Sequence, residues 1–131
     1  MPHHFHAVVW IDHAETRIFE FGTGGIEHHR IRPTDRRGNI HHKSGTVGSG
    51  HEHEDKHYLA AIASALKPNH EILIVGHGQA KIELAHHIRD HVPALALRIM
   101  GVETLYHPTE GEVIAFARNF FEKKDRTTPQ L

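Results

Sequence analysis

The amino-acid sequence predicts an α/β fold in which helices cover a mixed five-stranded sheet. Near the amino terminus, short apolar runs rich in β-branched residues follow one another at hairpin spacing, as in an antiparallel meander. Further along the chain, apolar runs alternate with segments of helical periodicity, as in parallel β-α units. The 131 residues include 38% hydrophobic and 24% charged residues, which is enough for one globular domain with its own core.

Three strands are expected before the first helix. Residues 5–11 (FHAVVWI) are almost continuously apolar, which is typical of a central strand that is buried on both faces. A polar connection over residues 12–15 leads to a second strand at 16–21 (TRIFEF). A glycine-rich turn over residues 22–25 leads to a third strand at 26–32 (IEHHRIR), whose polar composition indicates a place near the edge of the sheet.

The rest of the chain predicts alternating helices and strands. The helical periodicity begins near Glu52 and ends at Lys67-Pro68-Asn69. Thr109 and Glu112 have the spacing of a capping box, and they predict the start of the last helix. The remaining elements are a strand at 71–75, a helix at 79–91 and a strand at 95–100, with a frayed tail after Glu122.

The resulting order, βββαβαβα, is that of ribonuclease H-like folds. We expect residues 1–125 to form a single domain and residues 126–131 to form a frayed tail. The chain has no cysteine, no apolar run that could span a bilayer and no recognisable signal peptide. These features favour a cytoplasmic protein without a disulfide framework.

Basic residues and glycines gather between the third strand and the first helix. Residues 33–51 show no periodicity, and a segment of this length without structure is often functional. Arginine and lysine neutralise phosphates, and glycine lets the backbone approach a nucleic acid closely. A solvated loop without a partner is the alternative. The residues predicted to contact RNA over 30–51 are Arg30, Arg32, Arg36, Arg37, His41, His42, Lys43, Gly45, Gly48 and Gly50.

A second motif, ILIVGHGQAK, joins an apolar strand to a helix. Free backbone N–H groups at the start of that helix could bind an anion, with Gly76, Gly78 and Lys81 as the candidate residues. The motif satisfies neither the Walker A pattern nor the dinucleotide-binding pattern. A tight turn that needs glycine for its geometry is the favoured interpretation.

Histidines provide candidate metal ligands. The chain has 17 of them, and residues 53–57 match the zinc-protease pattern H-E-x-x-H. His53 and His57 would share a face only if the helix had already begun at His53, and no persuasive third ligand follows. His51, His53 and His57 therefore predict at most a modest metal site, together with Asp12 in a metal-dependent hydrolase or nuclease.

The layout resembles the central domain of archaeal and eukaryotic peptide-chain release factors and Pelota, and above all short bacterial relatives called translational machinery proteins. The resemblance runs from AVVWIDHAETRIFEF through HHKSG and ILIVGHGQAKIEL to GVETLYHPTEGEVIAFARNFF. In release factors, a Gly-Gly-Gln tripeptide after the third strand promotes hydrolysis of peptidyl-tRNA. The matching residues 41–50 contain glycines but no glutamine. The resemblance therefore implies proximity to the ribosome or tRNA without release activity, as in Pelota-like factors of ribosome rescue or hibernation.

The sequence thus predicts a non-catalytic, ribosome- or RNA-associated translation factor whose partner is the ribosome, its rRNA or a tRNA. No cofactor is expected, and bound zinc or nickel would be adventitious. The alternatives are the metal-dependent hydrolase and a histidine-rich metal-binding protein. A homodimer is left open.

Overall fold

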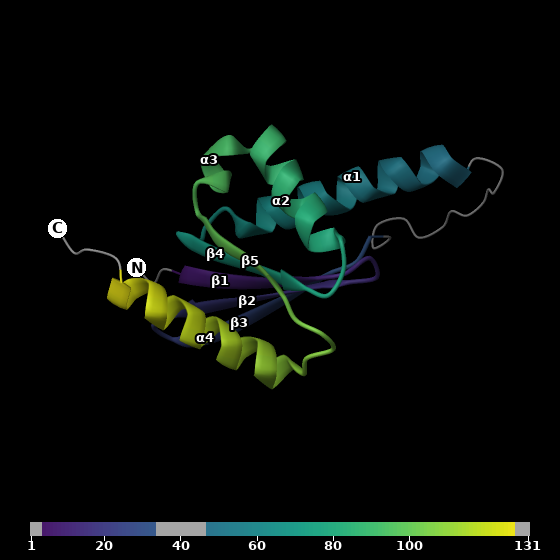
Figure 1. Ribbon diagram of the computed structural model, residues 1–131. Coiled ribbons are helices and arrows are strands. Elements are labelled where there is room, and N and C mark those ends of the chain that lie inside the picture. The colour runs from purple at the N-terminus through teal and green to yellow at the C-terminus, as the bar shows by residue number, and fades with distance from the viewer. Residues whose placement is uncertain (1–3, 34–46, 128–131) are drawn as a thin grey trace.

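The computed structural model describes the backbone of residues 4–33 and 47–127 and the side chains of residues 6–33 and 56–125. Its elements follow the predicted order, with one short additional helix (Figure 1). They are β1 His4–Ile11, β2 Thr16–Gly22, β3 Gly25–Ile31, α1 Val47–Leu66, β4 Glu71–Gly76, α2 Ala80–His91, α3 Pro93–Ala96, β5 Ile99–Thr104 and α4 Glu110–Thr127.

The five strands form one mixed sheet in the order β3-β2-β1-β4-β5. β2 is antiparallel to both β1 and β3, whereas β4 is parallel to both β1 and β5. The order confirms the predicted fold class, with the first strand at the centre and the polar third strand at one edge.

Helices cover both faces of this sheet (Figure 1). α1, α2 and α3 lie on one face, and α4 lies on the other. Because successive side chains of a strand point to opposite faces, β1 contributes to two separate cores. Ala7, Val9 and Ile11 pack beneath α1 and α2, and Val8 packs beneath α4. All four are at most 1% exposed, as the apolar run at the start of the chain predicts.

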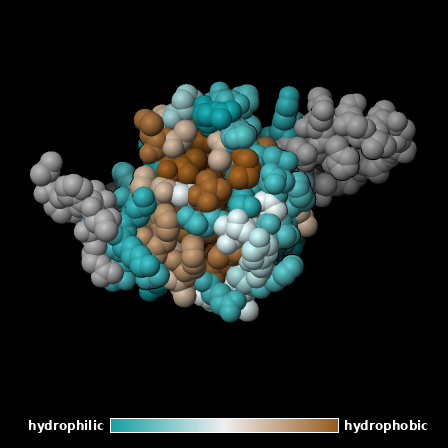
Figure 2. Space-filling model, in the orientation of Figure 1, coloured by the Kyte–Doolittle hydropathy of each residue, from teal (hydrophilic) through white to brown (hydrophobic). Residues whose placement is uncertain are grey.

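Apolar residues also reach the surface beside β5, which is the second edge strand. Figure 2 shows them gathered over β5 and the helices that flank it. Leu97, just before β5, is 83% exposed. A hollow of about 360 Å³ lies between Glu103 of β5 and Phe116 and Phe120 of α4. An edge strand can pair with a second chain, but the homodimer stays a prediction.

No helix in the described part of the chain has the length and apolar character that crossing a bilayer requires.

The first helix begins earlier than predicted. α1 starts at Val47, not near Glu52, so that Gly48, Gly50 and His51 are helical and the connection after β3 is shorter than residues 33–51. Glycine has low helix propensity, which is why this stretch predicts a loop. Extending an existing helix costs little, since each added residue gains a backbone hydrogen bond without a new nucleation step.

Two later boundaries also differ. Residues 95–100 were predicted to be the fifth strand, but Leu95 lies in α3 and β5 begins at Ile99. Pro93 starts the short helix because its fixed φ suits the first helical turn. α4 continues to Thr127, beyond Glu122, so the predicted tail is helical over its first residues.

The start of α4 matches its prediction. Thr109 N–H donates to Glu112 Oε1 at 2.8 Å, and Glu112 N–H donates to Thr109 Oγ1 at 3.1 Å. These reciprocal bonds satisfy two backbone donors that a helix start leaves free, which confirms the capping box.

We expect Gly76→Ala to destabilise the fold, because a Cβ at this position would lie 2.6 Å from the backbone oxygen of Ile11. Backbone atoms cannot move aside as a flexible side chain can, so β1 and β4 would have to separate. A cost of about 1–3 kcal/mol in the free energy of unfolding is expected, measured by urea denaturation. Gly78→Ala is the matched control, since nothing lies within 4 Å of its Cβ position. Equal stabilities for the two variants would contradict this account of the β1–β4 contact.

Candidate nucleic-acid interface

The carboxyl ends of four strands lie along one edge of the sheet, and the residues that follow them form the candidate site. β1, β3, β4 and β5 run in the same direction, since β2 alone is antiparallel to its neighbours. Asp12, Arg32, His77 and Leu105 come directly after these strands. We call this the carboxyl edge. In Figure 1 it lies on the side where α1 and α4 begin.

Three arginines surround one glutamate at the carboxyl edge. The carboxylate of Glu15, in the turn between β1 and β2, lies 2.8 Å from Arg17 Nε and 3.3 Å from both Arg30 Nε and Arg32 Nε. We refer to these four residues as the arginine cluster. Three guanidinium charges against one carboxylate charge leave a net charge of +2. The side chains of Arg30 and Arg32 are 44% and 51% exposed, so this charge is accessible to a polyanion.

The arginines lower the pKa of the Glu15 carboxyl. The hydrogen bond from Arg17 is the largest cause, and the charges of Arg30, Arg17 and Arg32 act in the same direction, while burial opposes them. Glu15 is therefore ionised at neutral pH. It keeps three mutually repelling guanidinium groups together on adjacent strands.

An aromatic side chain helps to hold one of these arginines. Trp10 is paired with Arg17 in the β1–β2 register, and Arg17 is paired with Arg30 in the β2–β3 register. The three residues therefore form a row across three strands, on the face that α4 covers. Arg17 Cζ lies 5.2 Å from the centroid of a Trp10 ring, which is the geometry of a cation–π contact.

The turn that carries Glu15 is built by hydrogen bonds. Asp12 Oδ1 accepts from the backbone N–H groups of Ala14 at 2.8 Å and Glu15 at 2.9 Å. Tyr58 OH, from α1, donates to Asp12 O at 2.9 Å and lies 2.6 Å from Thr16 Oγ1. Since the phenol has only one proton, the Thr16 hydroxyl donates to it. Burial raises the pKa of Tyr58, which keeps this donor protonated.

The Gly76-His77-Gly78 turn lies beside this hairpin, after β4. Gly76 is needed there because of the close approach to Ile11 described above. Lys81 is 8% exposed, and its Nζ donates to Gly78 O at 2.7 Å, so the lysine stabilises the turn that precedes its own helix. This geometry favours the tight-turn interpretation. Anion binding by Gly76, Gly78 and Lys81 stays a prediction.

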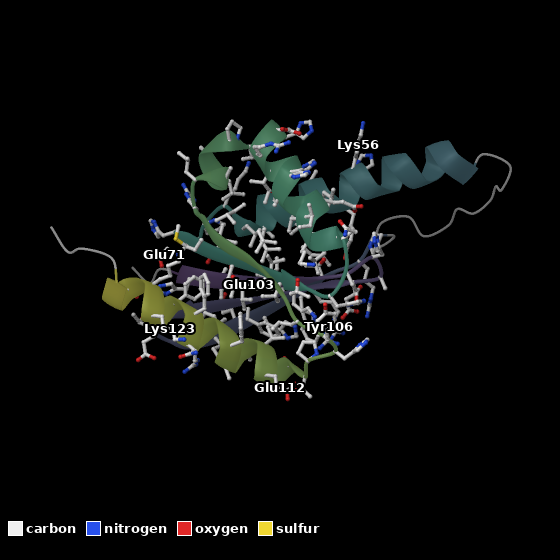
Figure 3. The ribbon with its side chains drawn as sticks, in the orientation of Figure 1. Lys56, Glu71, Glu103, Tyr106, Glu112 and Lys123 are labelled. Atoms are coloured by element: carbon white, nitrogen blue, oxygen red, sulfur yellow. The ribbon has the colours of Figure 1, made fainter. Side chains whose placement is uncertain are left out.

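Further polar and aromatic groups lie on the β5 side of the same edge. Leu105 N–H donates to Gly76 O at 3.0 Å, which brings the segment after β5 against the turn after β4. The rings of His77 and His107 consequently lie 5.4 Å apart. Tyr106, the neighbour of His107 in the chain, is 76% exposed at this edge (Figure 3).

The structure places the predicted RNA-contacting residues in different parts of the fold, and some of them lie outside the described residues. Arg30 and Arg32 lie at the carboxyl edge, where both form ion pairs with Glu15. Arg30 belongs to β3, and Gly48 and Gly50 belong to α1, so they are not loop residues. Arg36, Arg37, His41, His42, Lys43 and Gly45 lie outside the described residues.

The predicted metal ligands lie on one helix. α1 contains His51, His53 and His57, so His53 and His57 are one helical turn apart, which meets the condition stated above for the H-E-x-x-H pattern to place them on one face. His57 is exposed. Neither group of three candidate ligands in the described part of the chain includes His57. Asp12 Oδ1 is engaged in the turn, so its position is explained by the hairpin.

Sequence reasoning missed Glu15, Arg17 and Trp10. The signal was available in principle, because a β1–β2 hairpin in the observed register pairs Trp10 with Arg17. Tyr106 and His107 carry no comparable pattern. Their proximity to the Gly-His-Gly turn depends on the parallel pairing of β4 with β5.

Comparison with known proteins is informative at the level of three-dimensional structure. No protein-family model and no curated protein matches this chain. Its structure superposes on Pelota from Archaeoglobus fulgidus with a TM-score of 0.64, at 13% identity and over 93% of this chain. Pelota from Thermoplasma acidophilum gives a TM-score of 0.60, at 21% identity over 93% of this chain. The archaeal translation termination factor aRF1 gives a TM-score of 0.51, at 11% identity over 92% of this chain.

The chain has the fold of the central domain of Pelota and aRF1. It corresponds to 33% and 35% of the two Pelota chains and to 39% of aRF1. This Pelota-like fold agrees with the resemblance inferred from the sequence.

We expect Glu15→Gln to reduce stability at neutral pH and to have little effect in acid. Because folding lowers the pKa of Glu15, its contribution is present above the ordinary glutamate pKa of about 4.3 and is lost as the pH falls through the lowered pKa. For a partly exposed cluster the expected cost is about 0.5–1 kcal/mol at pH 7 and low salt, from urea denaturation. The control, Glu122→Gln, removes an exposed acid of α4 away from the cluster. A cost for Glu15→Gln that is the same at pH 7 and pH 3 would argue against the ion pairs as its source.

Proposed function

We propose that this chain is a non-catalytic translation factor that binds the ribosome or a structured RNA at its carboxyl edge. The observation that carries the proposal is the arginine cluster, whose net charge of +2 lies directly before the segment 34–46. That segment adds Arg36, Arg37 and Lys43 against Asp35. Phosphate backbones bind such concentrations of positive charge by releasing their own counterions.

The fold supports a role in translation. aRF1, which shares this fold, is a translation termination factor. A ribosomal partner, rRNA or tRNA, is what the resemblance to release factors and Pelota implies, and it carries with it a cytoplasmic location. The chain covers only about a third of those structures, so their activities and partners enter here as part of the proposal.

Two features support the absence of catalysis. Residues 41–50 contain no glutamine with which to promote peptidyl-tRNA hydrolysis, as the resemblance would require. Asp12, the best-placed carboxylate for a metal-dependent nuclease, uses Oδ1 to accept two backbone hydrogen bonds. In this proposal the protein acts by occupying a site on RNA.

A metal-dependent hydrolase is the second candidate, and one observation favours it. His53 and His57 both belong to α1 and are one helical turn apart, which is the spacing of two metal ligands. RNA hydrolysis in the presence of Zn²⁺ or Mn²⁺ by the wild-type protein, lost in both Asp12→Asn and His57→Gln, would establish this candidate over the non-catalytic one.

The double substitution Arg30→Ala with Arg32→Ala is expected to weaken co-sedimentation with purified ribosomes. Each lost phosphate contact reduces the slope of log affinity against log salt concentration by about 1, so a reduction of about 2 is expected. The pair Arg36→Ala with Arg37→Ala tests the adjoining segment in the same way. The measurement is pelleting over a range of salt concentrations, with circular dichroism to verify folding.

Arg89→Ala provides the matched control, since Arg89 is also an exposed arginine paired with an acid, Asp90, but lies near the end of α2. Folded double variants that pellet with the wild-type affinity and salt slope would rule out the carboxyl edge as the RNA contact. If the wild-type chain itself neither pellets with ribosomes nor binds deacylated tRNA, the proposed function is wrong.

A further inference from the structure

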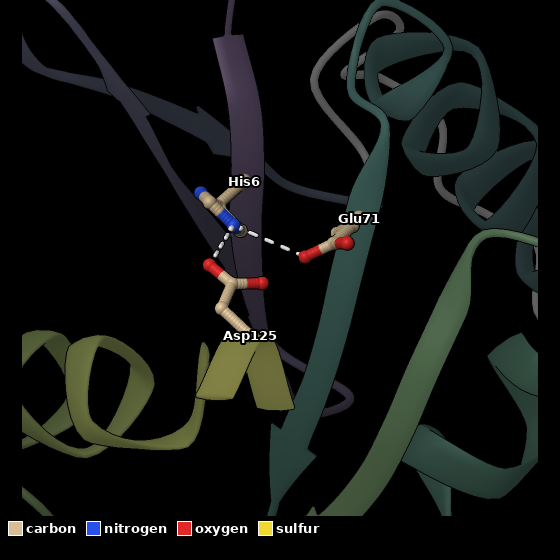
Figure 4. A group of neighbouring side chains, drawn as sticks. All are labelled: His6, Glu71 and Asp125. Carbon is tan, nitrogen blue, oxygen red and sulfur yellow. Dashed lines mark ion pairs between the residues drawn. The ribbon is translucent and has the colours of Figure 1, made fainter. Parts of the chain in front are cut away.

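A second group of chemically active side chains lies at the opposite edge of the sheet, where β1 and β4 begin and α4 ends. His6 of β1 and Glu71 of β4 are paired in the parallel register. Asp125 comes from the last turns of α4. The three side chains come from distant parts of the sequence and point toward one another (Figure 4). We call this group the amino-edge triad.

The distances within the triad suit a metal ion. His6 Nε2 lies 3.1 Å from Glu71 Oε1 and 3.8 Å from Asp125 Oδ2. One ligand atom of each residue lies within 4.8 Å of the others. Nitrogen and oxygen ligands are about 2.0–2.2 Å from a Zn²⁺ ion, so two ligands of the same ion are roughly 3–4 Å apart. Both separations from His6 Nε2 fall in that range.

One carboxylate oxygen of the triad is buried without a hydrogen bond in the described part of the chain. Glu71 Oε1 is shielded from solvent and accepts no hydrogen bond from the described residues, although His6 Nε2 is close to it. A shielded carboxylate oxygen without a hydrogen bond is costly, and an ion is one of the partners that removes this cost.

The net negative charge of the triad also favours a bound cation. A protonated His6 between two carboxylates leaves a net charge of −1, and a neutral His6 leaves −2. A divalent cation bound by a neutral imidazole and two carboxylates gives a net charge of zero. His6 is also held in place by the ring of Phe121, whose centroid is 4.4 Å away, so little ordering remains when an ion binds.

An ion can reach the triad from solvent. His6 and Asp125 line a cavity of about 510 Å³, together with Phe121 and Glu122 of α4 and Arg118. Asp125 is 55% exposed. Three protein ligands and an accessible cavity leave at least one coordination position for water.

A second group of candidate ligands in the described residues consists of Glu20, Glu27 and His29. It differs from the amino-edge triad in the hydrogen bonds that its carboxylate oxygens accept. Glu20 Oε2 accepts from Asn69 Nδ2 at 2.8 Å, and Glu20 Oε1 lies 2.9 Å from His29 Nε2 in a hydrogen bond. Both carboxylate oxygens of Glu20 therefore already take part in hydrogen bonds, so this group gains less from binding an ion than the amino-edge triad does.

We propose that His6, Glu71 and Asp125 form a binding site for a divalent transition-metal ion, with Zn²⁺ as the expected occupant, that ties the end of α4 to β1 and β4. The imidazole ligand favours zinc and its neighbours over Mg²⁺ and Ca²⁺, which prefer oxygen ligands throughout. The ion would join the last turns of α4 to two strands that are already paired in the sheet at His6 and Glu71.

The test must separate this site from the other histidines of the chain. Protein purified without a nickel column and treated with a chelator is titrated with Zn²⁺ by calorimetry, and thermal unfolding is recorded with and without the ion. We expect one Zn²⁺ site that is tighter than all others and a rise in Tm by mass action. Asp125→Asn is expected to weaken that site at least tenfold, since even partners outside the coordination shell are worth about 10- to 100-fold.

Two further variants make the result specific. His6→Gln is expected to have the same effect as Asp125→Asn. The control, His87→Gln with His91→Gln, removes a histidine pair of α2 whose rings lie 4.6 Å apart, and it is expected to retain the tight site. Mn²⁺ added to the wild-type protein is expected to broaden the NMR signals of Phe121 before those of His87.

The proposal is overturned if Asp125→Asn binds Zn²⁺ as the wild-type protein does, if the tight site is lost in the α2 control instead, or if only several weak, adventitious sites are found. Ribosome binding, which depends on the carboxyl edge, is expected to be the same for Asp125→Asn and the wild-type protein.

Discussion

Burial of β1 on both faces is the constraint on which the rest of the structure depends. Ala7, Val8 and Val9 are completely shielded from solvent, and they contribute to two cores at once. A strand of this kind must have neighbours on both sides and helices on both faces, since otherwise its apolar residues or its backbone groups would meet water. β2 and β4 provide the neighbours, and α1, α2 and α4 provide the cover.

The same strand determines where chemistry can occur. Its two ends lie at opposite edges of the sheet, and each edge gathers polar groups from several elements. At the carboxyl edge the hairpin after β1 presents Glu15 to three arginines. At the amino edge, His6 meets carboxylates from β4 and α4. The two groups have opposite net charge, which is why the proposed partners differ, a polyanion at one edge and a cation at the other.

Under the proposed function, the structural contact that Glu15 makes with the arginines also serves binding. A single carboxylate cannot neutralise three guanidinium groups, but it can hold them in fixed positions before a partner arrives. Ordering the arginines in advance lowers the entropy that binding must otherwise lose. An additional acid at the cluster would reduce the surplus charge from +2 to +1, while removal of Glu15 would leave the arginines to repel one another.

Most of the fold was predictable from the sequence, but several element boundaries were not. Apolar periodicity identified the three-stranded meander, and the capping box located the start of α4. The start of α1 was misjudged because glycine propensity is a local quantity, whereas extension of a helix depends on the turn already formed. The fifth strand was placed too early because a short apolar run suits both a helix and a strand.

The candidate sites were predictable only in part. Clustering of basic residues within a few positions of one another is visible in the sequence, and it drew attention to Arg30 and Arg32, which the structure places beside Glu15. Their partner Glu15 is separated from them by a whole hairpin, so only strand pairing brings it near. The amino-edge triad joins residues 6, 71 and 125. By itself, the sequence determined which segments are apolar and therefore what the elements are. Only the tertiary structure decided which charged side chains face one another, because contacts between distant residues depend on strand order and register and leave no local pattern.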